Sequence, residues 1–258
     1  MIIALAIIVV AAGGSAGYFL LRVPLSGQGH PSWRVVEAPF WPTSLIRPSI
    51  WALAPDDVWI FGMTSPSLES SGIWRFDGRE FSFVVGLPNP YCFSSYVRSE
   101  NEIWLGGCDE NGMCLYRWDG ERWTKYVPVG KENHASELIL GIDMLSQDEG
   151  WAIADFEDYQ LAYHDQHPYY PLRFTGSCFL HWDGKEWRVV PSPPVYLLSI
   201  DMLSPDEGWA VGNDNILHWD GREWRVVPSP VFSAPIYIDM LSPNEGWIIT
   251  GREILKYG

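Results

Sequence analysis

Short apolar runs alternate with polar turns along most of the chain. Residues 196–230 show the pattern most clearly, where the runs LLSIDML, GWAVG, ILHW and WRVV are separated by SPDE, NDN and DGRE and followed by PSP. Each run is rich in Val, Ile, Leu and Trp, and each break carries Gly, Pro, Asn or Asp. This combination is typical of strands joined by tight hairpins. The unit therefore predicts four antiparallel strands that form one sheet.

The same unit recurs along the chain. A tryptophan opens its second run at Trp59, Trp104, Trp151, Trp209 and Trp247. A repeat of about 40 residues with four strands is typical of a β-propeller, in which each repeat forms one blade. The sequence therefore predicts an all-β fold, a five-bladed β-propeller of four-stranded antiparallel blades.

The two ends of the chain complement each other. The last repeat stops at residues 254–258, after its third run, whereas residues 32–36 (SWRVV) match the missing fourth run and have no first three runs before them. An unpaired sheet edge would remain exposed in an open propeller. We therefore expect the N-terminal strand to complete the last blade and close the ring. A chain truncated within a repeat is the alternative.

The N-terminal leader has no charged residue between positions 2 and 21. A helix of about 20 residues is long enough to span a bilayer core. We expect residues 1–22 to be a transmembrane anchor or a cleaved signal segment, residues 23–31 a tether, and residues 32–258 the propeller. Arg22 on the propeller side would favour a cytoplasmic propeller by the positive-inside rule. The cysteines favour an extracytoplasmic propeller, and this is the position that we expect.

Four cysteines gather at one end of two neighbouring repeats. Cys108 and Cys114 flank a predicted hairpin turn, and Cys92 and Cys178 each begin a predicted strand. An even number of clustered cysteines predicts two disulfides and an oxidising compartment. Zinc binding and four free thiols are the alternatives, and no C-x-x-C spacing favours zinc.

Three aspartates occupy one position of the first strand, eight residues before the repeat tryptophan: Asp143, Asp201 and Asp239. The first two repeats have Trp51 and Tyr96 there instead, and both are candidate binding residues. Carboxylates on adjacent inner strands could hold a cation or act as the acid and base of a glycosidase. However, their sequence contexts are nearly identical, whereas catalysis needs carboxylates with different environments. A structural role, such as accepting a backbone N–H of the neighbouring blade, is therefore favoured.

Residues 155–177 form the one long segment that the repeat does not explain. The candidate binding residues in this insertion are Tyr159, Tyr163, His164, His167, Tyr169 and Tyr170. Tyrosine is favoured in recognition surfaces because its ring buries area while its hydroxyl forms hydrogen bonds. A plug over the channel mouth is the alternative, and His164 with His167 could bind a metal. We predict no metal and no cofactor.

Two further histidines, His181 and His218, align with positions that hold Arg75, Arg117 and Lys256 in other repeats. A position that accepts Arg, Lys or His indicates a solvated strand face rather than a ligand site.

The DEGWAVG and ILHWDGxxW cores of the repeat resemble bacterial propeller repeats of the BNR/Asp-box kind, and above all photosystem II assembly-factor-like propellers. The resemblance covers residues 32–258, although the Asp-box turn S-x-D-x-G-x-T-W is replaced here by DGKEW or DGREW. The sialidase site of related propellers has no counterpart that can be mapped. The resemblance implies protein binding.

The net charge excludes one class of partner. The net charge of −15 argues against a nucleic-acid partner, which needs a basic surface. We expect a monomeric, membrane-anchored, non-catalytic binding or assembly module that recognises a protein or glycan through its loop-rich face. That face is the end of the sheets where the connections between second and third strands meet the connections between blades. A carbohydrate-active enzyme that uses the three aspartates is the alternative.

Overall fold

The computed structural model describes residues 19–22, 33–36, 45–64, 71–89, 92–109, 111–129, 138–157, 174–193, 195–212, 215–228 and 235–258. Within these residues every regular element is a β-strand. The chain divides into two compact units, Met1–Pro90 and Tyr91–Gly258, which are described separately. Five antiparallel sheets, one for each repeat, confirm the predicted all-β five-bladed propeller. Four of the sheets have four strands, and the last has three.

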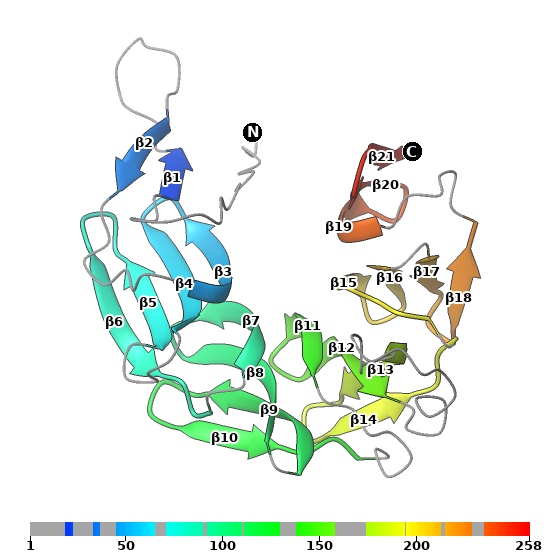
Figure 1. Cartoon of the computed structure of the whole chain (residues 1–258), viewed down its shortest axis with the longest axis horizontal. Coiled ribbons are helices and arrows are strands. Elements are labelled where there is room, and N and C mark those ends of the chain that lie inside the picture. Colours follow the sequence, from blue (N-terminus) through cyan, green and yellow to red (C-terminus); the bar gives the residue numbers. More distant parts are fainter. Residues whose placement is uncertain are drawn as a thin grey trace, which may run out of the picture. The chain divides into compact units, whose positions relative to one another are not determined.

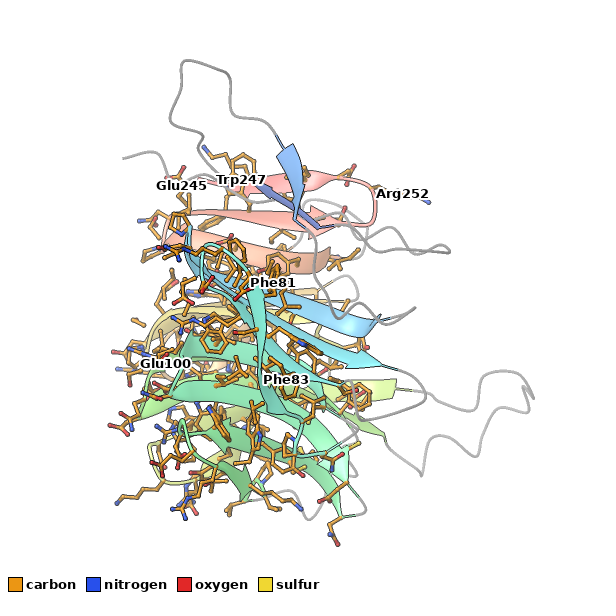
Figure 2. The ribbon with its side chains drawn as sticks, turned by 90° about the vertical axis from the view of Figure 1, so that its left-hand side faces the viewer. Phe81, Phe83, Glu100, Glu245, Trp247 and Arg252 are labelled. Carbon is orange, nitrogen blue, oxygen red and sulfur yellow. The ribbon has the colours of Figure 1, made fainter. Side chains whose placement is uncertain are left out.

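The first unit contains one blade and a separate strand pair. The blade has the order β3-β4-β5-β6 and consists of β3 (Leu45–Ala54), β4 (Asp57–Thr64), β5 (Gly72–Phe76) and β6 (Phe81–Gly86). The separate pair consists of β1 (Phe19–Arg22) and β2 (Trp33–Val36). Phe83 on β6 is 55% exposed and is labelled in Figure 2.

The second unit contains the other four blades (Figure 1). The first is β7 (Cys92–Ser99), β8 (Glu102–Asp109), β9 (Gly112–Trp118) and β10 (Trp123–Tyr126). The next is β11 (Ile139–Ser146), β12 (Glu149–Glu157), β13 (Phe174–Trp182) and β14 (Trp187–Val190). The third is β15 (Ser199–Ser204), β16 (Glu207–Gly212), β17 (Asn215–Trp219) and β18 (Trp224–Val227). The last is β19 (Pro235–Ser242), β20 (Glu245–Thr250) and β21 (Ile254–Tyr257).

The predicted closing strand has a different partner in the structure. β2, which contains the SWRVV segment apart from its first residue, pairs antiparallel with β1. β21 pairs with β20 and with no other described strand. Closure of the propeller by residues 32–36 therefore stays a prediction.

The leader is described only at its end, where β1 covers the last four residues of the expected anchor segment. Residues 1–18, and with them most of the predicted transmembrane helix, lie outside the described residues. In the described ranges we find no helix with the length and apolar character needed to span a bilayer.

Each four-stranded blade closes its last hairpin with an Asp-Gly turn. In the first blade the Oδ1 atom of Asp77 accepts the backbone N–H groups of Arg79 and Glu80, at 2.9 and 3.0 Å. Gly78 follows with φ of 92°, a conformation that side-chain-bearing residues rarely adopt. The other three blades repeat the turn with Gly120, Gly184 and Gly221, all at positive φ. These turns fix the register between third and fourth strands, so the aromatic residues before and after them face each other.

Tryptophans fill the interfaces between blades of the second unit. One set consists of Trp104, Trp182 and Trp187, and the equivalent set one blade further consists of Trp151, Trp219 and Trp224. Each set combines a second-strand tryptophan with the third- and fourth-strand tryptophans of the following blade. Phe179 stacks on Trp224 with ring centroids 3.9 Å apart. Most of the repeat tryptophans therefore serve packing.

Candidate functional site

The inner strands of the second unit bring the predicted aspartates into one row. β7, β11, β15 and β19 are the first strands of their blades and lie next to one another in that order (Figure 1). Tyr96, Asp143, Asp201 and Asp239 occupy the same register position, each opposite the repeat tryptophan of its own blade. Trp51 holds the same position on β3 of the first unit, opposite Trp59.

Side chains in this row form hydrogen bonds to the backbone of the following blade. The Oδ2 atom of Asp143 accepts the N–H of Met202 at 2.6 Å, and that of Asp201 accepts the N–H of Met240 at 2.5 Å. The hydroxyl of Tyr96 donates to the carbonyl oxygen of Met144 at 2.8 Å. The bonds of the two aspartates are of the kind that the repeated sequence context predicted.

The methionines whose N–H groups donate to the two carboxylates pack against glycines of their own blades. Met202 lies across Gly208 of the next strand, where a Cβ atom would come 2.2 Å from the methionine sulfur. The same contact recurs between Met240 and Gly246, where the distance would be 2.1 Å. A larger residue at these glycines would force the end of the methionine side chain to move. The repeated Asp-Met and Gly-Trp sequences thus combine a methionine–glycine contact within a blade with a hydrogen bond between blades.

The environment of the row raises the pKa values of Asp143, Asp201 and Tyr96. Burial is the main cause for Asp143, whose pKa rises to about 7, and for Asp201, whose pKa rises to about 6. Each also feels the negative charge of the next aspartate, while the accepted N–H opposes the rise. Burial likewise raises the pKa of Tyr96 to about 12. Both carboxyl groups are thus shifted in the same direction and not pushed apart, as an acid and base pair would be.

Buried hydrogen bonds anchor both ends of the insertion at its base. Asp155 on β12 is 1% exposed, and its Oδ1 accepts the N–H of Leu138 at 2.8 Å. Ser177, opposite Asp155 on β13, is fully buried, and its hydroxyl oxygen accepts the N–H of Leu197 at 2.9 Å. The Asp155 carboxyl group, at the start of the insertion, is therefore buried and accepts a hydrogen bond within its own blade.

These two bonds also locate the loop-rich face. Leu138 lies at the entry to the blade that carries the insertion, and Leu197 at the entry to the following blade. The connection between β12 and β13 therefore begins and ends beside the connections between blades, as predicted. Tyr159, Tyr163, His164, His167, Tyr169 and Tyr170 lie outside the described residues. The sequence gives little indication that the Asp155 carboxyl group and the Ser177 hydroxyl group are buried. The only such indication is the apolar residues around Asp155.

The cysteines are thiols in the structure, so the predicted disulfides are not confirmed. Cys108 is opposite Met113 and Cys114 is opposite Gly107. Because successive residues of a strand point to opposite faces, this register directs the Cys108 and Cys114 side chains to different faces of the sheet. Burial raises the pKa of Cys178 to about 12, as expected for a thiol of the core. Within the described ranges no group of three His, Cys, Asp or Glu could hold a metal ion.

The histidines of the third strands are not simply solvated. The His218 ring lies against Trp209, tilted by 41° with ring centroids 4.4 Å apart, and its Nε2 is 2.8 Å from the Oε1 of Glu207. His181 forms the equivalent contacts in the preceding blade. In the last blade, Lys256 lies over Trp247 and near Glu245. Figure 2 labels Trp247 and Glu245. The position is thus a cation or imidazole held between a tryptophan and an acid, which explains why Arg, Lys and His all fit.

Comparison with known proteins supports the fold. No family model and no curated protein matches the chain. The solved structure of YCF48 bound to a D1 peptide has a TM-score of 0.61 and 15% identity, covering 93% of this chain and 71% of that chain. YCF48 from Cyanidioschyzon merolae has the same TM-score of 0.61 and 15% identity, with 93% and 74% covered. The WD40 propeller domain of Doa1 has a TM-score of 0.55 and 13% identity, with 93% and 73% covered. The chain is therefore a β-propeller that resembles those of photosystem II assembly factors.

Proposed function

We propose that this protein is a non-catalytic binding or assembly module, anchored to a membrane by its N-terminal segment, whose propeller recognises a protein or glycan through the loop-rich face. A protein is the favoured partner, since one similar structure is YCF48 bound to a D1 peptide. An extracytoplasmic position of the propeller and membership of the BNR/Asp-box group are part of this proposal.

The observation that carries the proposal is the use of the inner carboxylates. Asp143 and Asp201 each accept a backbone N–H of the neighbouring blade, so one oxygen of each carboxyl group is already engaged in a hydrogen bond between blades. Breaking such a bond would leave a peptide N–H without its acceptor, which costs about 1–3 kcal/mol. These groups therefore hold the blades together, and recognition is assigned to the insertion and its neighbouring loops.

The anchored base supports the insertion as the recognition element. Asp155 and Ser177 hold both of its ends by hydrogen bonds within the blades, so the segment between them can vary without changing the sheet. Binding residues are commonly carried by loops that a rigid scaffold positions. The six tyrosines and histidines named above would then provide the contacts.

Closure of the propeller by residues 32–36 belongs to the same proposal. The ring centroids of Trp209 and Tyr257 lie 5.0 Å apart. These two residues occupy the second-strand and third-strand positions of the tryptophan sets in the preceding interfaces. The third member would come from a fourth strand, and Trp33 has the matching sequence position. Ile254 on β21 is 66% exposed, as expected for a strand that still lacks its neighbour.

A loop replacement tests the recognition element. Residues 158–173 are replaced by the short Asn-Asp-Asn turn of positions 213–215, so that Asp155 and Ser177 are kept. Partners of the full chain and of this variant are then compared by quantitative mass spectrometry after affinity capture from the source cells. We expect the captured partner to disappear while the melting temperature changes little. Retained capture would contradict the proposal, and a collapse of the melting temperature would favour the plug over the channel mouth.

A glycosidase is the second candidate, because a raised pKa is what a general acid requires. The raised pKa values of Asp143 and Asp201 are the observation in its favour. A panel of aryl glycosides decides between the two. Turnover that is lost in the Asp201→Asn variant would overturn the non-catalytic assignment.

A further inference from the structure

Two blades of the second unit end in nearly the same sequence. Residues 181–193 read HWDGKEWRVVPSP and residues 218–230 read HWDGREWRVVPSP, so the two segments differ only in Lys185 and Arg222. Both fourth strands pair with their third strands in the same register: Arg188 is opposite His181 and Arg225 is opposite His218. The outer edges of β14 and β18 therefore present the same backbone groups.

The edge of β14 carries a further strand segment. Val129 forms a parallel bridge with Arg188, in which the Val129 N–H donates to the carbonyl oxygen of Trp187 at 2.8 Å. In turn the Val189 N–H donates to the carbonyl oxygen of Val129 at 3.0 Å. The segment that follows β10 thus adds one bridged residue to the outer edge of the blade that contains β14. This edge is consequently able to bind an extended chain.

The corresponding edge of β18 has no such partner among the described residues. Its outward groups are the carbonyl oxygen of Trp224 and the N–H of Val226, which match Trp187 and Val189. Val226 is 50% exposed, whereas Val189 beneath the docked segment is half-buried. The link that precedes this blade is engaged elsewhere, because Val195 accepts the N–H of Ser177.

The Arg225 side chain on β18 is held in the same way as Arg188 on β14. Arg225 is tied to the turn of its own blade by Asp220, at 3.0 Å, and by Glu223, at 2.5 Å. Arg188 makes the equivalent ion pairs beside the docked Val129, so this arrangement is compatible with a bound strand.

We propose that the outer edge of β18 is a second docking site, which binds an extended segment of a protein partner in parallel with the strand. The segment places a small β-branched residue opposite Arg225, with its N–H on the Trp224 carbonyl oxygen and its carbonyl oxygen on the Val226 N–H. Strand addition at a sheet edge is an established mode of peptide recognition. Val129 on β14 supplies the model for this contact. The probe takes the sequence of residues 125–131 (KYVPVGK), whose two lysines suit a protein of net charge −15.

The probe is a capped peptide of the sequence KYVPVGK, titrated into the isotope-labelled full chain in detergent micelles while backbone amide signals are followed by NMR. We expect the signals of Arg225 and Val226 to shift and those of Arg188 and Val189 to stay, because residue 129 already occupies the latter edge. A peptide methylated on the nitrogen of its second valine is the matched control, since it lacks the N–H that Trp224 accepts. We expect its binding to be weaker by about tenfold.

The Val226→Pro variant provides the reciprocal test, because it removes the outward N–H without touching the bonds between β17 and β18. Unchanged Arg188 and Val189 signals show that this variant is folded, and the N-methylated peptide tests the same contact without altering the protein. No shift at Val226 with millimolar peptide, or equal binding of the methylated peptide, would overturn the proposal. Concentration-dependent shifts of Val226 without peptide would overturn it as well, since a second copy of the chain would then occupy the edge. Loss of partner capture on loop replacement is independent of these outcomes.

Discussion

Replacing Asp143 by Asn separates the structural role of the inner carboxylates from their charge. The amide keeps an oxygen that can accept the Met202 N–H, but it cannot ionise. Because the pKa of Asp143 is raised from 3.8 to about 7, the folded protein binds its proton more tightly than the unfolded chain does. The associated stability is therefore fully present below pH 4 and is lost as the pH rises to about 7.

The magnitude follows from the size of this rise. A shift from 3.8 to about 7 is linked to about 4 kcal/mol of unfolding free energy. Asp143 is only partly covered, so water screens its charge, and we expect about 1–2 kcal/mol. Between pH 4 and pH 8, the free energy of unfolding of the Asn variant should rise by this amount relative to that of the natural protein. Above pH 8 the difference should stay constant.

Urea unfolding of the full chain, followed by tryptophan fluorescence at several pH values, measures the difference. Asp77→Asn is the matched control, because backbone N–H groups of Glu80 and Arg79 lower the pKa of the Asp77 carboxyl. That group stabilises the fold above the ordinary carboxyl pKa, and its contribution is lost as the pH falls. The control should therefore lose stability relative to the natural protein as the pH rises. Parallel pH profiles for Asp143→Asn and the natural protein would refute the reasoning.

Three further predictions concern packing and closure. Trp224→Ala should lower the free energy of unfolding by about 3–5 kcal/mol, measured by urea titration, because it removes a buried indole stacked on Phe179; a loss below about 1 kcal/mol would contradict the proposed packing role. Ser177→Ala should cost about 1–3 kcal/mol in the same assay, since the Leu197 N–H loses its acceptor; an unchanged midpoint would show that this bond does not hold the base. Deletion of residues 29–37 should cost about 3–5 kcal/mol through the loss of Trp33 and its strand, and unchanged cooperative melting would show that the propeller closes elsewhere.

The sequence was most informative where one pattern is repeated. The Asp-Gly turns and the repeat tryptophans predicted the blades, because each turn conformation and each buried indole leaves its own residue signature. The identical contexts of Asp143 and Asp201 also predicted hydrogen bonds between blades.

Features that depend on strand register or on a single contact were harder to predict from the sequence. Cys108 and Cys114 are close in sequence, yet a register of one residue directs them to opposite faces of the sheet. The burial of Asp155 depends on a backbone N–H that only the folded link supplies. The bridge of Val129 to β14 involves backbone atoms alone, so no side-chain pattern marks it.

Site-specific photo-crosslinking is the most direct test of the central claim, that a partner binds through the insertion. A photoreactive amino acid replaces Tyr163 in the insertion and, as the control, Lys185 in an exposed Asp-Gly turn away from the loop-rich face. After irradiation in the source cells, crosslinked proteins are identified by mass spectrometry. We expect one defined protein to crosslink to position 163 and not to position 185. No crosslink at position 163, or the same products at both positions, would contradict the account.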